Sequence, residues 1–175
     1  MLKEVKIRIG IIILILCLTP AIFWLVTPLF ITKNVNEALP KKNTSTHSNN
    51  SPSKTTIKKV EIIKQGHFTK IDNIHKGSGS ATIYKQNNNT YFLRLENFKV
   101  TNGPALQVLL STHLSPKTKK DLHSQPYTSL GKLKGNTGNQ NYTIPINVNI
   151  NSIKSVIIHC KPFNVVFSTA SLNNH

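Results

Sequence analysis

The sequence predicts an all-β fold, an antiparallel β-sandwich or barrel, behind one N-terminal transmembrane helix. Three observations support this prediction. Short segments rich in β-branched and aromatic residues recur along residues 60–175 and are separated by turn-forming residues. No amphipathic segment of helical period and useful length lies among them. Residues 9–31 form an uncharged apolar run, long enough to supply the roughly 20 residues of helix that cross a bilayer.

Composition divides the chain of 175 residues into four parts. Residues 1–8 are a basic head that we expect in the cytoplasm, and residues 9–31 are the anchor. This run exceeds the roughly 7–15 apolar residues of a signal peptide, and no small-residue cleavage site follows it. Residues 32–59 are polar and rich in Ser, Thr and Asn, so we expect a flexible linker that holds the domain tens of ångströms from the membrane. Residues 60–175 form the β domain.

This layout predicts a single-pass protein of the cell membrane whose C-terminal domain lies outside the cytoplasm. Lysines lie on both sides of the anchor, so the orientation rests on the short basic head before a long apolar run. The N-x-S/T sequons at Asn43, Asn88 and Asn141 are compatible with export, but a chain this rich in Asn forms sequons by chance. The sequence leaves open whether they carry glycans.

The formal net charge is +16, and the basic residues are scattered along the chain. Arginine occurs only at Arg8 and Arg94. A nucleic-acid-binding protein usually shows a basic stripe with arginines, so we expect no nucleic-acid partner. A solvated lysine-rich surface explains the charge. Attraction to anionic lipid, to a cell-surface polymer or to an acidic redox partner is the alternative.

Seven strand segments are expected in the β domain, each bounded by turn residues. In chain order they span residues 60–68, 74–84, 91–98, 105–111, 130–133, 138–145 and 155–167. The turns between them include Asn87-Asn88-Asn89 and Asn102-Gly103-Pro104. Pro145 favours an edge position or a strand end, because proline cannot donate to a ladder. Residues 112–125 are expected as a polar, basic loop, and residues 147–152 as a loop or short helical turn.

The last segment holds Cys160, the one cysteine outside the anchor, since Cys17 lies in the apolar run. Strand alternation places Cys160 and His159 on opposite faces, so His159 is not expected to act simply as the base for the thiol. Three roles stay open for Cys160: a small buried hydrophobic residue, a redox thiol or ligand, and an intermolecular disulfide. Pro162 would interrupt the ladder and expose the sulfur.

Metal and cofactor chemistry is restricted by the residues present. A blue-copper site needs two histidines, a cysteine and usually a methionine, whereas Met1 is the only methionine and only His175 follows Cys160. No C-x-x-C-H motif exists for covalent haem, and no metal site is assigned. Non-covalent haem bound through Cys160, His75 or His159 stays open. The few carboxylates lack paired spacing and no G-x-S-x-G motif occurs, which argues against a hydrolase.

Several landmarks of the domain share an order and spacing with a known family. They are Gly66 and Phe68, His75 with Ser78-Gly79, Asn97-Phe98, residues 102–111, residues 130–135, residues 138–145, and the closing residues 156–172 with Cys160 and Phe163. Over about residues 62–172 they resemble the electron-transfer DM-thirteen domain family. The resemblance implies a small β-rich extracellular domain, often found beside haem-binding domains of the DOMON type. It also implies that Cys160 matches the family's characteristic cysteine, for which redox chemistry is proposed, as a naked thiol or through a prosthetic group.

Two departures from the family pattern alter the surroundings of this cysteine. His159 stands where the family usually has an aromatic residue, and Ser168-Thr169-Ala170 replaces a glycine-containing segment. The expected function is a membrane-anchored, extracytoplasmic redox or electron-transfer module centred on Cys160, with an unidentified redox or cell-surface protein as its partner. The alternative is a non-catalytic cell-surface binding domain with a buried structural cysteine. The sequence leaves open whether the domain is an enzyme, which molecule donates or accepts electrons, and the oligomeric state.

Overall fold

The computed structural model describes residues 16–17, 19, 31–40, 60–86 and 89–175. The predicted basic head, most of the predicted anchor and most of the predicted linker lie outside the described residues, as do Asn43 and Asn88. Within the described part of the chain, no helix has both the length and the apolar character needed to cross a membrane.

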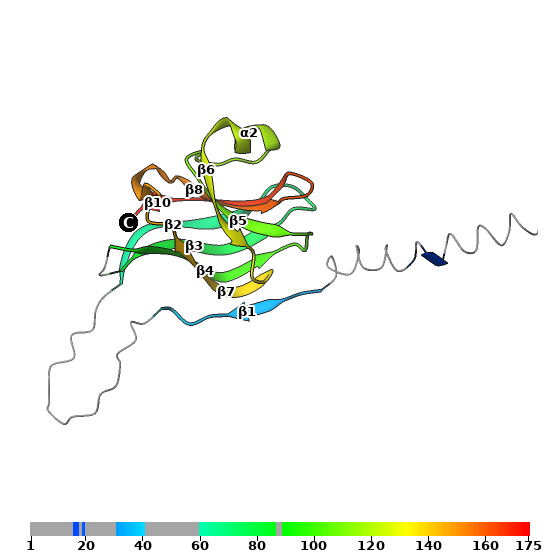
Figure 1. Cartoon of the computed structure of the whole chain (residues 1–175), viewed down its shortest axis with the longest axis horizontal. Helices are drawn as coiled ribbons and strands as arrows, with labels where there is room; N and C mark the ends of the chain where they lie inside the picture. Colours follow the sequence, from blue (N-terminus) through cyan, green and yellow to red (C-terminus); the bar gives the residue numbers. More distant parts are fainter. Residues whose placement is uncertain (1–15, 18, 20–30, 41–59, 87–88) are drawn as a thin grey trace, which may run out of the picture.

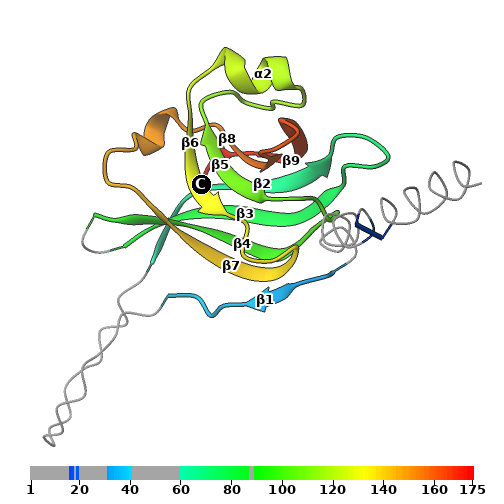
Figure 2. The same cartoon turned by 45° about the vertical axis from the view of Figure 1, so that its right-hand side comes forward.

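The strands form one curled, half-barrel sheet (Figure 1) in the order β1-β7-β4-β3-β2-β9-β8-β5-β6, with β10 paired to β2. Figure 2 shows the same curl from a second direction. Every strand pair of the described residues is antiparallel except β1 and β7, which are parallel. The strands are β1 (Asn34–Asn36), β2 (Glu61–Lys70), β3 (Gly77–Lys85), β4 (Tyr91–Val100), β5 (Leu106–Ser111), β6 (Tyr127–Lys132), β7 (Thr137–Ile144), β8 (Ser155–Cys160), β9 (Val165–Ser171) and β10 (Asn173–Asn174). The prediction of a β-rich, mainly antiparallel domain is therefore confirmed.

The inner face of the sheet carries the main hydrophobic core. Alternating residues of each strand point to it, as the period of two requires. On β4 these include Leu93 and Leu95, and on β8 they are Val156, Ile158 and Cys160, all with no solvent exposure. Because β8 lies between β5 and β9, it is also hydrogen-bonded on both sides.

A second, smaller cluster lies on the outer face of the same region and is covered by helix α2 (Lys119–Ser124). Leu122 of α2 is fully buried and belongs to this cluster with Ile157 of β8. Thr118 is the N-cap residue directly before the helix, and its side chain forms a capping box with Asp121. The prediction that residues 112–125 form a loop is therefore wrong over Lys119–Ser124, which are helical. The sequence does not indicate this helix because it is short and has a single apolar residue, so no helical period can be detected.

The sequence predicted one strand over residues 155–167, and the structure divides this segment into β8 and β9. Residues 161–164 form the turn between the two strands. Pro162 has no N–H for a ladder, and Asn164 has a left-handed backbone with φ of 53°. Asparagine tolerates this conformation better than most residues, so the sequence supports a hairpin at this point.

The predicted boundaries after Gly135 agree better with the structure. Strand β7 ends at Ile144, directly before Pro145, as a strand end requires. However, β7 is not an edge strand, because β1 covers its outer side. The short helical turn expected near residue 150 is the 3-10 helix η2 (Ile150–Ser152).

Strand β1 lies within residues 32–59, where the composition predicts a flexible linker. The structure places Asn34, Val35 and Asn36 beside Thr137, Gly138 and Asn139 of β7. The strand propensity of this short, mainly polar segment does not predict that it pairs with β7. The pairing depends instead on contacts of its side chains with residues that are distant in the sequence.

Gly66 lies on β2 where the end of β9 passes closely over it. A Cβ atom at Gly66 would lie 1.9 Å from the carbonyl oxygen of Ser171. We expect Gly66→Ala to lower the free energy of unfolding by about 3 kcal/mol, because a backbone carbonyl must move. Gly131→Ala is the matched control: nothing lies within 4 Å of its Cβ position, and its φ of 101° leaves only backbone strain, about 1 kcal/mol. Urea unfolding measures both, and equal losses would contradict the close approach.

Candidate functional site

Cys160 is the last residue of β8, and its side chain is buried in the main core with 0 % exposure. Its partners across the sheet are Leu106 on β5 and Val165 on β9. The thiol donates a hydrogen bond to the carbonyl oxygen of Pro104, with an Sγ to O distance of 3.2 Å. Pro162 lies in the following turn but does not expose the sulfur. Cys160 is therefore a shielded thiol whose one polar contact is a backbone carbonyl.

The turn that supplies this carbonyl is packed against an aromatic ring. A Cβ atom at Gly103 would lie 2.6 Å from the ring of Phe167, so glycine is what allows the ring to approach the turn. Phe167 lies at a register shift between β8 and β9, and it belongs to the same core cluster as Cys160. The ring of Phe167 also contacts the imidazole of His75 edge to face, with centroids 4.5 Å apart. Phe167 thus contacts both His75 and the turn that binds the thiol.

His75 is held in one orientation by Asp72. The Nδ1 atom of His75 lies 2.7 Å from Oδ2 of Asp72, and Oδ1 accepts the backbone N–H groups of Ile74 and His75. The side-chain hydrogen bond from His75, followed by its backbone N–H, lowers the pKa of Asp72 to about 2. The Asp72 carboxylate binds Nδ1 of His75, so Nε2 points away from Asp72. Histidines that bind metals are often oriented by a carboxylate in the same way.

His159 lies on the outer face of β8, opposite Cys160, and is 5 % exposed. Its Nδ1 atom lies 2.9 Å from Nε2 of Gln107, and its Nε2 atom lies 2.9 Å from Oδ1 of Asn164. Nδ2 of Asn164 lies 3.1 Å from Nε2 of His123 on α2. The hydroxyl of Ser129 on β6 donates to Oε1 of Gln107. These contacts form one consistent chain when His159 is neutral and carries its proton on Nε2.

The buried position of His159 has an electrostatic consequence. Desolvation is the largest influence and lowers the pKa of His159; the hydrogen bond to Asn164 raises it by less, and the charge of the nearby His123 lowers it slightly further. Gln107 and Asn164 could not be identified from the sequence, because their contact with His159 depends on strand register and on the hairpin turn. The network joins β5, β6, α2 and the turn after β8, so it helps to hold α2 against the outer face of the sheet.

The three sequence candidates are not brought together. Cys160 points into the core, His159 points to the outer face, and His75 reaches the surroundings of Cys160 through Phe167. The packed apolar neighbours of Cys160 leave its sulfur no open side, so the arrangement does not fit an iron-porphyrin bound through Cys160. Among the described residues, no group of three His, Cys, Asp or Glu side chains is arranged to hold a metal ion.

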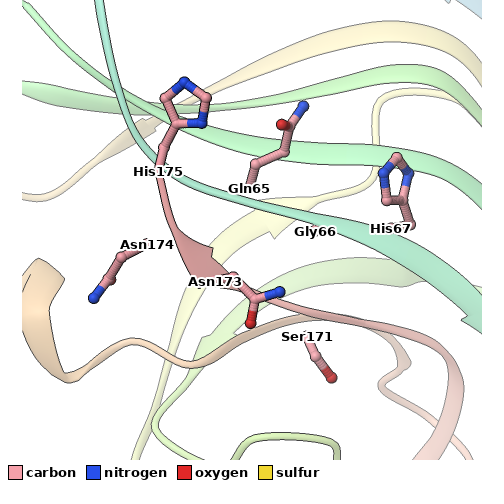
Figure 3. A pocket seen from close by; sticks show the side chains of 7 residues that line it. All are labelled: Gln65, Gly66, His67, Ser171, Asn173, Asn174 and His175. Carbon is pink, nitrogen blue, oxygen red and sulfur yellow. The ribbon is translucent and has the colours of Figure 1, made fainter.

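A shallow, open hollow lies elsewhere on the domain, between β2 and the C-terminal residues (Figure 3). Its lining residues are Gln65, Gly66, His67, Ser171, Asn173, Asn174 and His175. Figure 3 shows the rings of His67 and His175 well apart, with Gln65 between them. The two imidazoles therefore do not converge on one point, and none of the three sequence candidates lines this hollow.

Comparison with known protein families identifies a match over most of the β domain. The family model described as Electron transfer DM13 matches residues 67–172. This range covers 106 of 175 residues, begins within β2, and includes β3 to β9 with Cys160 and the Gly103–Pro104 turn. No curated protein and no solved structure matches the chain.

The burial of Cys160 predicts a thiol that is inert in the folded protein. In a full chain carrying Cys17→Ser, we expect Ellman's reagent to react with Cys160 only as the domain unfolds, because thiolate chemistry requires access. Adding Lys161→Cys in the same background creates an exposed thiol one residue away, which should react at once. Native Cys160 reacting as fast as this control would contradict its burial.

The lowered pKa of His159 predicts a loss of stability in mild acid. The unfolded chain binds a proton more readily than buried His159, so stability is fully present above pH 6.5 and falls as the pH decreases through that value. We expect His159→Gln to weaken this dependence, because the amide does not titrate. Urea unfolding at pH 7.5 and 5.5 measures it, with His67→Gln as the exposed control. The same pH dependence in His159→Gln and the wild type would contradict this role.

Proposed function

This chain belongs to the Electron transfer DM13 family, and from that premise we propose that its β domain is an electron-transfer module with Cys160 as the redox-active group. One observation carries the choice of residue. The other sulfur-containing residues of the chain, Met1 and Cys17, precede the matched segment, so Cys160 holds its only sulfur atom. Sulfur is the side-chain atom that changes oxidation state most readily in proteins.

The surroundings of the thiol favour one kind of redox step. Thiol–disulfide exchange requires a second thiolate to attack the sulfur, and the packed neighbours of Cys160 exclude such an attack. One-electron oxidation instead passes one electron from the sulfur to a one-electron acceptor on the redox partner, releases one proton and leaves a sulfur-centred radical. The carbonyl of Pro104 accepts the S–H hydrogen bond, but as a backbone amide it cannot keep the proton. The proton therefore leaves to solvent past the half-buried Gly103–Pro104 turn, and the midpoint potential falls by about 59 mV per pH unit.

We further propose that electrons pass between Cys160 and the redox partner through Phe167. Its ring contacts the turn that binds the thiol on one side and the partly exposed His75 on the other. His75 is fixed by Asp72, so its ring keeps the contact with Phe167. This chain of contacts is the route that the side chains offer between the surface and the buried sulfur.

Membrane anchoring is part of the same proposal. The uncharged run at residues 9–31 acts as a single span, and the domain lies outside the cytoplasm, where a redox or cell-surface protein is its partner. The length of the apolar run and the basic head before it support this arrangement.

A second function is favoured by the burial itself. A free cysteine with no exposure, apolar neighbours and one backbone contact is also what a structural cysteine looks like. In that case the domain is a non-catalytic binding module of the cell surface, and Cys160 contributes packing alone.

Film voltammetry of the full chain separates these two functions. In the Cys17→Ser background, we expect an oxidation wave that shifts with pH, and we expect adding Cys160→Ser to remove the component of that wave contributed by the thiol. The oxidation of the tyrosines and the tryptophan is common to both chains and serves as the reference. Circular dichroism checks that Cys160→Ser remains folded. Identical waves from Cys17→Ser and from the folded double variant would contradict the role of the thiol and would favour the binding module.

A further inference from the structure

Strand β1 comes from the segment directly after the predicted membrane span, and it adds a parallel strand to β7. The backbone N–H of Glu37 donates to the carbonyl of Asn139 at 2.9 Å. The backbone N–H of Thr137 donates to the carbonyl of Lys33 at 3.3 Å. The segment is thus hydrogen-bonded to β7 at both of its ends.

The carboxylate of Glu37 provides the strongest side-chain contact of this segment. It lies 2.8 and 3.0 Å from Nζ of Lys134 and accepts the backbone N–H of Asn141 at 2.7 Å. The guanidinium of Arg94 donates to the backbone carbonyl of Glu37 at 3.1 Å. Burial alone would raise the pKa of Glu37, but the hydrogen bonds and charges of Lys134 and its neighbours lower it overall. The segment is therefore held by charge as well as by backbone pairing.

Glycines on the β7 side leave the space that this segment occupies. A Cβ atom at Gly138 would lie 2.0 Å from the carbonyl oxygen of Val35, and one at Gly135 would lie 2.4 Å from that of Lys33. Any side chain at these two positions would push β1 away. The edge of β7 is thus shaped to accept a strand in this register.

Asn136 connects the start of β1 to the turn beside Cys160. Its Oδ1 atom accepts the backbone N–H of Lys33 at 2.6 Å, and its side-chain amide donates to Oδ1 of Asn102. Asn102 precedes Gly103 and Pro104, whose carbonyl accepts the thiol hydrogen bond. The first residues after the predicted span are therefore tied to the same end of the sheet as the thiol.

The arrangement of the sheet agrees with this connection. Figure 1 shows the turn between β8 and β9, and the loop of residues 71–76, at the end of the sheet from which β1 starts. Thr101 donates its backbone N–H to the carbonyl of Lys76 at 2.9 Å, which joins that loop to the turn. His75, Phe167 and Cys160 therefore belong to the end of the domain nearest residue 31.

We propose that β1 is a clamp that holds the domain against the bilayer, with the Cys160 end of the sheet facing the lipid headgroups. This inference rests on the proposed membrane anchor and on the proposed role of Cys160. Its consequence is that the redox partner reaches His75 and Cys160 from the membrane surface and not from the bulk phase.

The length of chain between the predicted membrane span and the domain depends strongly on whether β1 is docked on β7. With β1 docked, the step from residue 31 to residue 34 spans at most about 10 Å of extended chain. A free linker of residues 32–59 would separate span and domain by about 30 Å on average and would leave the orientation random. Position and orientation relative to the membrane are therefore both measurable consequences of the clamp.

Energy transfer from the domain to labelled headgroups measures both quantities. The full chain carrying Cys17→Ser is placed in vesicles of phosphatidylcholine and phosphatidylglycerol with an acceptor dye on the headgroups. A donor dye is attached to Lys161→Cys or to Lys154→Cys, two exposed lysines that flank the opposite ends of β8. We expect higher transfer from position 161 than from position 154, because β8 is about 20 Å long and the clamp turns its Cys160 end toward the lipid.

A charge reversal tests whether β1 causes this difference. Glu37→Lys places a lysine against Lys134, and we expect it to abolish the difference between the two dyes and the exchange protection of the Thr137 amide. Adding Lys134→Glu should restore both. Glu61→Lys makes the same charge change on the exposed start of β2 and should change neither.

The outcomes separate the clamp from the proposals on which it rests. Equal transfer from both positions on vesicle-bound wild type, or higher transfer from position 154, overturns the clamp alone. Loss of the chain from vesicles in a carbonate wash overturns the membrane anchor, and the clamp with it. A difference that persists in Glu37→Lys shows that β1 does not set the orientation and also overturns the inference.

Discussion

Strand β8 is hydrogen-bonded on both sides and covered on both faces, and much of the domain is arranged around this burial. Its inner side chains require the core that the curled sheet encloses. Its outer side chains require a second cover, which α2 supplies through Leu122 above Ile157. His159 shares that outer face, and a buried imidazole needs partners to replace water. Gln107 and Asn164 are those partners, so the hairpin turn and α2 are tied together where β8 ends.

The sequence allowed the strands to be located because their signal is local: β-branched and aromatic residues alternate, and Gly, Asn and Pro interrupt them. It also placed Cys160 and His159 on opposite faces, since side-chain alternation needs no knowledge of the partner strand. The features that it did not predict depend on distant contacts. Leu122 is one apolar residue in a polar loop until the outer cluster covers it. Asn34–Asn36 is a three-residue segment with no alternating pattern until Gly138 leaves room for it and Lys134 binds the following Glu37.

Family membership and burial constrain Cys160 in different ways, and together they narrow its chemistry. Membership indicates electron transfer, whereas burial excludes the attack of a second thiol. In the proposed function, Cys160 exchanges electrons only through the atoms packed around it. Gly103 then contributes to this route as well as to the turn. A side chain at this position would displace the ring of Phe167, which contacts both the turn and His75.

The acidic residues show how this strongly basic chain uses its few negative charges. The sequence contains six, and of the five that lie in the described part of the chain four make specific side-chain contacts. Asp72 orients His75, Asp121 caps α2, Glu96 pairs with Arg94, and Glu37 joins β1 to Lys134. Three of these contacts lie within the segment that the family model matches, and Glu37 lies outside it. Glu37 is therefore the charge by which the segment before the family domain recognises that domain.

A linker that served only as a spacer would need no carboxylate bound by a lysine and a backbone N–H, and its neighbours would need no glycines at Gly135 and Gly138. The precise fit of a short polar segment against β7 is better explained by a requirement for a fixed orientation than by a requirement for reach.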